Sequence, residues 1–123
     1  MKVEEIIKIV DAEVLQGEGN WNANIKYGFA ADLLSDTLFI ISREEEESVL
    51  LITGVTNPSV VKTAKILDIP IVLIARGKPV EKETIELAKR EKIILLRTKH
   101  IVFVTCGLLY KAGLEGALWK IQY

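Results

Sequence analysis

The fold is decided by residues 49–98, which read VLLITGVTNPSVVKTAKILDIPIVLIARGKPVEKETIELAKREKIILLRT. Three apolar runs in this stretch begin about 22 residues apart, and each precedes a segment with helical periodicity: Val49 to Thr53, Ile69 to Ala75 and Ile93 to Leu96. Strands joined by helices of this length must be parallel, because a crossover connection needs about a dozen residues. We therefore predict an α/β fold, a three-layer α/β/α sandwich with a largely parallel sheet built from successive β-α units.

Two amphipathic segments connect these strands. Residues 58–68 place apolar side chains on one face and polar ones opposite, with Asn57 as the N-cap and Pro58 as the first helical residue. Residues 81–91 carry acids near their start and bases near their end, as the helix dipole favours. The inward positions expected in this second helix are Ile85 and Ala88.

A last helix is predicted from Lys99 to Ala112, with Thr98 as its cap. This segment is apolar almost all round, so we expect it to be central in the domain or covered by another chain. His100 would stand in its first turn with a structural or surface role, and Cys106 would be a small core residue.

The N-terminal third is less regular. Residues 3–10 carry one apolar stripe and predict a short helix, whereas the Gly and Asn residues of 17–24 predict a loop. Residues 25–30 suit a strand, and residues 32–41 are interpreted as a helix despite the strand propensity of 37–41. The acidic run 44–47 predicts a solvated turn.

Composition narrows the function classes. The chain has 123 residues, 16 Lys and Arg against 17 Asp and Glu, one His and one Cys, which indicates a single domain over residues 1–123. The balanced charge gives no argument for nucleic acid or a membrane surface. One Cys excludes an internal disulfide, and one His with one Cys cannot form a transition-metal cluster, so we expect neither metal nor cofactor.

No leader or membrane span is evident, and a cytoplasmic protein is expected. Abundant Ile, Lys and Glu are typical of proteins from hot environments.

The phosphate-binding glycine motifs of kinases and dehydrogenases are absent from the sequence. The general rule for open α/β sheets remains: ligands bind where the carboxyl ends of strands meet helix N-termini. The candidate anion site at this edge consists of Thr53, Gly54, Thr56, Asn57, Arg76, Gly77 and Thr98. The alternative is that these residues only cap helices and form turns.

Three features together resemble a DRTGG domain: residues 28–36, GFAADLLSD, the strand 51–53 followed by Asn57, and Thr98 before the apolar last helix. The resemblance spans about residues 3–113 and leaves 114–123 as a C-terminal tail. Of the letters that name the family only Gly28 persists, while the segment Asp32 to Ser35 matches better.

Domains of this family are similar to the N-terminal domain of HPr kinase/phosphorylase and occur beside CBS domains in regulated pyrophosphatases. Short free-standing members accompany iron-only hydrogenase genes. The family has no established catalytic residues, and the resemblance implies a regulatory or dimerising module. Within the matching segment, Asp32, Ser35 and Asp36 form a second group of candidate ligand-binding residues.

The leading hypothesis is thus a non-catalytic module that forms a homodimer and senses a small anionic metabolite, by analogy an adenine nucleotide. A first alternative is a small enzyme acting on a phosphorylated metabolite, with Asp32, Asp36 and Arg76 near the reaction centre. A second is a protein-interaction subunit without a ligand. The homodimer interface is predicted from four apolar residues near the C-terminus: Phe103, Trp119, Ile121 and Tyr123.

Overall fold

The computed structural model describes residues 1–41, 48–118 and 120. Within them it places five helices and six strands, ordered α1 (Val3–Val10), β1 (Glu13–Gln16), β2 (Tyr27–Ala30), α2 (Leu34–Ile41), β3 (Val49–Thr53), α3 (Ser59–Ile66), β4 (Ile71–Ile74), α4 (Lys82–Glu91), β5 (Ile94–Arg97), α5 (Val102–Lys111) and β6 (Glu115–Gly116). The strands form one sheet in the order β1-β5-β4-β3-β2-β6. β1 pairs antiparallel with β5, and the other described pairs are parallel.

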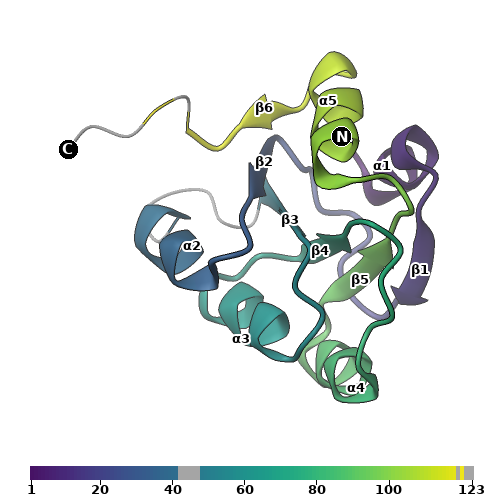
Figure 1. Ribbon diagram of the computed structural model, residues 1–123, viewed down its shortest axis with the longest axis vertical. Helices are drawn as coiled ribbons and strands as arrows, with labels where there is room; N and C mark the ends of the chain where they lie inside the picture. The colour runs from purple at the N-terminus through teal and green to yellow at the C-terminus, as the bar shows by residue number, and fades with distance from the viewer. Residues whose placement is uncertain (42–47, 119, 121–123) are drawn as a thin grey trace.

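The helices cover the sheet on both faces (Figure 1). One core cluster joins α1 and α5 to alternate strand residues such as Leu50, Leu73 and Leu96. The other cluster joins α3 and α4 to the intervening residues of the same strands, such as Leu51, Val72 and Leu95. Leu34 of α2 packs against this second cluster. This alternation is the period of two that a strand buried on both faces requires. The predicted three-layer α/β/α fold is confirmed.

The order of elements from β3 to α5 agrees with the sequence prediction, and the three strands are mutually parallel. The helix bounds are shorter. α3 begins at Ser59 rather than Pro58, although the Asn57 side chain still accepts a hydrogen bond of 2.9 Å from the Ser59 amide. In α4 the inward residues are Thr84 and Ala88, while Ile85 is half-buried.

The predicted start of the last helix is wrong. α5 begins at Val102, so His100 precedes it. Thr98 does not cap the helix, because the N-cap residue is Ile101. The Thr98 hydroxyl donates to the carbonyl oxygen of Val10, 2.7 Å away in the core, and accepts from the His100 amide at 3.3 Å. The helix is also not central: it buries Thr105 and Leu109 against the sheet, and Phe103 is 82% exposed.

The N-terminal third contains one strand that the sequence analysis did not predict, β1. The helix over 3–10, the strand ending at Ala30 and the helix ending at Ile41 are confirmed, and residues 17–24 contain no helix or strand. The predicted turn over 44–47 lies outside the described residues. No helix in the described part of the chain is both long and apolar enough to cross a bilayer.

The C-terminal tail begins as part of the sheet. Leu114 is buried, and β6 adds a short parallel strand beside β2 at the sheet edge (Figure 1). The predicted interface residues of the tail, Trp119, Ile121 and Tyr123, lie outside the described residues.

Candidate functional site

The candidate site lies at the edge of the sheet where β2, β3, β4 and β5 end. Asp32 follows β2, Gly54 follows β3 and Arg76 follows β4. The Asp32 carboxylate is held by the neighbouring strand: its Oδ1 accepts hydrogen bonds from the Gly54 amide at 2.7 Å and from the Thr53 hydroxyl at 3.3 Å. Bonds to a backbone amide and to a buried hydroxyl fix where this carboxylate stands.

Gly54 stands between a carboxylate and a guanidinium. A Cβ atom at this position would lie 3.1 Å from Nη2 of Arg76 and 3.4 and 3.5 Å from the two carboxylate oxygens of Asp32. Within residues 1–41, 48–118 and 120, neither Oδ2 of Asp32 nor the Arg76 guanidinium has a hydrogen bond or ion pair. Asp32 and Arg76 are both exposed, so the two groups are available to a ligand that approaches from solvent.

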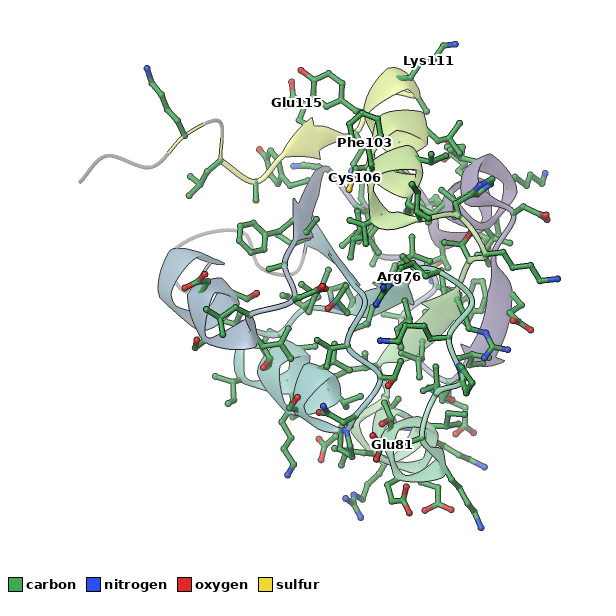
Figure 2. All side chains as sticks on the ribbon, in the orientation of Figure 1. Arg76, Glu81, Phe103, Cys106, Lys111 and Glu115 are labelled. Atoms are coloured by element: carbon green, nitrogen blue, oxygen red, sulfur yellow. The ribbon has the colours of Figure 1, made fainter. Side chains whose placement is uncertain are left out.

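The backbone at Arg76 is unusual. Its φ is +69°, in the left-handed region that non-glycine residues seldom adopt, and Gly77 follows with φ +60°. Two hydrogen bonds fix this turn: the Arg76 amide donates to the carbonyl oxygen of His100 and the Gly77 amide to that of Thr98, each at 2.8 Å. Figure 2 shows Arg76 between α5 and α4, at the end of the sheet.

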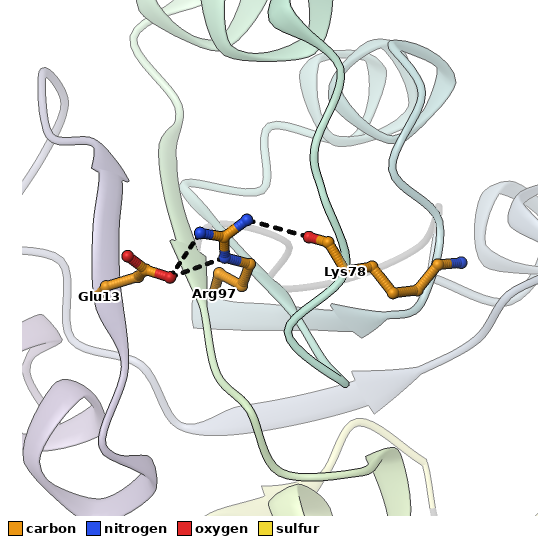
Figure 3. Close-up of polar contacts among 3 residues, drawn as sticks. All are labelled: Glu13, Lys78 and Arg97. Carbon is orange, nitrogen blue, oxygen red and sulfur yellow. Dashed lines mark hydrogen bonds and ion pairs between the residues drawn. The ribbon is translucent and has the colours of Figure 1, made fainter.

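The loop after Arg76 is tied to both neighbouring strands. Nζ of Lys78 donates to the carbonyl oxygen of Gly54 at 2.9 Å, which brings a second cation to the same glycine. On the other side, Nη1 of Arg97 donates to the carbonyl oxygen of Lys78 at 3.0 Å, and the same guanidinium pairs with Glu13 of β1 (Figure 3). The sequence analysis missed Lys78, although its place four residues after β4 was a signal.

The other predicted site residues make local contacts. The amides of Val55 and Ser59 donate to the side chains of Thr53 and Asn57, at 3.1 and 2.9 Å, and the carbonyl oxygen of Thr56 accepts from Thr84. Ser35 and Asp36 are exposed near the start of α2, and the described contacts do not join their side chains to Arg76. The structure brings together Asp32, Gly54 and Arg76, with Lys78 beside them.

Cys106 and the exposed face of α5 form a different surface. Cys106 packs partly against the core, and burial raises the pKa of its thiol. Phe103 and Tyr110 are 82% and 67% exposed. Phe103 lies about one turn before Gly107 and Tyr110 about one turn after it, and a Cβ at Gly107 would meet nothing within 4 Å. Figure 2 shows Phe103 and Cys106 along α5.

A shallow open depression of about 440 Å³ lies at the opposite edge of the sheet, where β2 begins. Its walls come from α1, from residues 24–27 and from residues 112–115, and they carry both acids and a base: Glu5, Glu115 and Lys26. The ammonium group of Met1 in this wall already donates to Asn24 and to the carbonyl oxygen of Ile25. The depression is thus separate from the strand ends that carry Asp32 and Arg76.

No protein-family model and no curated protein matches the chain. Among solved structures, it is similar to the CBS and DRTGG domains of the regulatory region of Clostridium perfringens pyrophosphatase, complexed with the activator diadenosine tetraphosphate. The TM-score is 0.64 at 21% identity, and the match covers 88% of this chain and 45% of that one. At this identity the likeness shows the fold, and it supports the sequence prediction of a DRTGG-like α/β domain.

Proposed function

We propose that the protein is a non-catalytic regulatory module that binds a small anionic metabolite, with an adenine nucleotide as the first candidate, at the carboxyl edge of its sheet. The observation that carries this proposal is the arrangement at Gly54, which has the Arg76 guanidinium and the Lys78 ammonium beside it. Two cations at the edge where open α/β sheets bind ligands favour an anion.

The similar pyrophosphatase region supports the choice of ligand, since it is a regulatory region complexed with a nucleotide activator. That chain is about twice as long as the part matched here, so its ligand is a starting point for this chain and no more. The catalytic alternative would need an activated nucleophile. Burial raises the pKa of the Cys106 thiol, so this side chain is not an activated nucleophile.

The test is a thermal-shift and calorimetric panel of nucleotides and phosphorylated metabolites. A ligand at about 100 times its dissociation constant stabilises the fold by about 2.7 kcal/mol. Arg76→Ala should weaken the binding of a detected anion by about 1 kcal/mol or more, the lower range for a charge-assisted hydrogen bond. Arg90→Ala removes the same charge from the exposed last turn of α4 and should leave affinity unchanged.

A flat panel would overturn the proposal of a ligand. Binding that survives Arg76→Ala would place the site elsewhere, first at the exposed residues Ser35 and Asp36.

We also propose that two copies of the chain pair through α5. Phe103 and Tyr110 are exposed on this helix and Ile101 just before it, and open space over Gly107 lies between the two aromatic residues. A protruding aromatic ring and a residue without a side chain on the same face are self-complementary: in an antiparallel pair, Phe103 of one protomer can fill the space over the partner's Gly107. An exposed apolar helix face of this kind is typical of an interaction surface.

A further inference from the structure

We propose that the ligand is a phosphate ester that carries a free vicinal diol, and that Asp32 accepts the hydrogen bonds of the diol while Arg76 binds the phosphate. This inference rests on the proposed function and adds the class of the ligand and its direction in the site. Ribonucleotides and sugar phosphates share this chemistry.

The first step concerns the Asp32 carboxylate. Its Oδ1 is already bonded to the Gly54 amide and the Thr53 hydroxyl, whereas Oδ2 has no partner within the described part of the chain. Asp32 is exposed, so Oδ2 faces solvent or a ligand. A carboxylate oxygen held in this way accepts hydrogen bonds and donates none, and it therefore selects a ligand that presents hydrogen-bond donors, which in a phosphate ester are its hydroxyl groups.

The second step is the short span between the two charged groups. Nη2 of Arg76 and both oxygens of Asp32 lie within 3.5 Å of the point where a Gly54 Cβ would stand. A ligand that contacts both side chains must then donate to the Asp32 carboxylate and accept from the Arg76 guanidinium at the same time. Inorganic phosphate offers negative charge to both and is repelled by Asp32, whereas a phosphate with hydroxyl groups beside it fits both.

The third step distinguishes phosphate from carboxylate. Nζ of Lys78 lies 2.9 Å from the carbonyl oxygen of Gly54, so a second positive charge lies at the same glycine as Arg76. Two cations match a phosphate ester, which carries nearly two negative charges at neutral pH, better than they match a single carboxylate.

The experiment is calorimetric titration of the full chain with four probes: AMP, 2′,3′-dideoxy-AMP, ribose 5-phosphate and inorganic phosphate. The main variant is Asp32→Asn, whose amide oxygen can still accept the Gly54 amide while the other atom becomes a donor. A second variant, Gly54→Ala, keeps the carboxylate and fills the space with a methyl group 3.1 Å from Nη2 of Arg76.

We expect the wild-type chain to bind AMP about tenfold or more tightly than dideoxy-AMP, because hydrogen bonds to charged groups are lost with the diol. Asp32→Asn should reduce this preference to about threefold or less, and it should bind inorganic phosphate more tightly as the repulsion disappears. Gly54→Ala should weaken the binding of AMP and of ribose 5-phosphate by a similar factor.

Equal affinity for AMP and dideoxy-AMP, with binding still dependent on Arg76, would overturn this inference and leave the proposed function intact. An Asp32→Asn variant that binds both AMP and phosphate more tightly would also overturn it, since Asp32 would then only repel anions. If ribose 5-phosphate binds as tightly as AMP, the site recognises the sugar phosphate. If it binds much more weakly than AMP, the site recognises the whole nucleotide. Failure of all four probes would overturn both proposals.

Discussion

Arg97 binds Glu13 through two nitrogens of its guanidinium, since Nε and Nη2 each lie 2.7 Å from Oε1 of the carboxylate. The third nitrogen donates to the carbonyl oxygen of Lys78, as Figure 3 shows. One side chain of β5 thus joins the antiparallel edge strand β1 to the loop that follows Arg76. We infer that Arg97 positions this loop.

Arg97→Lys should lower the free energy of unfolding by about 1 kcal/mol, because an ammonium cannot serve Glu13 twice and Lys78 at the same time. The Arg97 side chain is only 24% exposed, so the loss should exceed that of a fully exposed pair. Urea unfolding measures the change. Arg90→Lys, at an exposed position of α4, is the matched control and should change stability little; an equal loss in both variants would contradict the positioning role.

Asp32→Ala should destabilise the fold by about 1–2 kcal/mol, because the buried Gly54 amide loses its acceptor. Asp32→Asn keeps an acceptor oxygen and should stay within about 0.5 kcal/mol of the wild type. The comparison is made by chemical denaturation without ligand. If both variants lose the same stability, the charge of Asp32 rather than its bond to Gly54 supports the end of β3.

The sequence predicts the parallel part of the sheet because buried strands and amphipathic crossovers leave strong periodic patterns. β1 leaves a weak one: it has four residues, only Gln16 is buried, and its register with β5 slips between Val14 and Gln16. Its place depends on distant partners, since the Gln16 side chain donates to the carbonyl oxygen of Ile93 at 2.8 Å. Such a contact across 77 residues has no local signature.

The sequence predicts only part of the candidate site, because contacts between distant residues leave no local signature. The rule for strand ends points to Gly54 and Arg76, and the resemblance adds Asp32, but nothing in the sequence says that these three meet. The left-handed turn at Arg76 was not predicted, because arginine carries no preference for positive φ. Thr98 was predicted as a helix cap from its local context; its hydroxyl does accept from the His100 amide, but the helix starts later and the hydroxyl donates to the distant carbonyl oxygen of Val10.

Gly19→Ala should be strongly destabilising, by about 1–3 kcal/mol, because the added Cβ would lie 2.8 Å from the backbone oxygen of Lys92 and from Cγ1 of Ile94. The backbone oxygen cannot turn away. Gly17→Ala is the control in the same loop: its Cβ would meet only side chains, Val14 at 3.2 Å and Trp21 at 3.5 Å. Thermal unfolding of the two variants should differ clearly, and equal midpoints would contradict the close approach at Gly19.

Cys106 should react slowly with iodoacetamide at pH 7.5 and faster above pH 9, because burial raises its pKa and the thiolate is the reactive form. The folded chain then keeps this proton to higher pH than the unfolded chain. The free energy of unfolding should therefore fall as pH rises above about 8.5, the ordinary pKa of a thiol. Cys106→Ala should lack this component, and reaction at pH 7.5 as fast as that of a free cysteine peptide would contradict the raised pKa.

Phe103→Asp should convert the proposed homodimer to a monomer, because it places a carboxylate at the centre of the apolar face of α5, where Phe103 is 82% exposed. Light scattering at micromolar concentration should give twice the 13.7 kDa chain mass for the wild type and the single mass for this variant. A stable pair of this kind needs about 1,200 Å² or more of buried surface.

Ile66→Asp is the matched control, since Ile66 is 69% exposed on α3, on the other face of the sheet. It makes the same apolar-to-acid change and should leave the dimer intact. Circular dichroism should show both variants folded, because neither side chain is buried. A wild-type mass of one chain, or a dimer that persists in Phe103→Asp, would show that α5 does not hold two copies together; in the first case its aromatic face is left for a different partner.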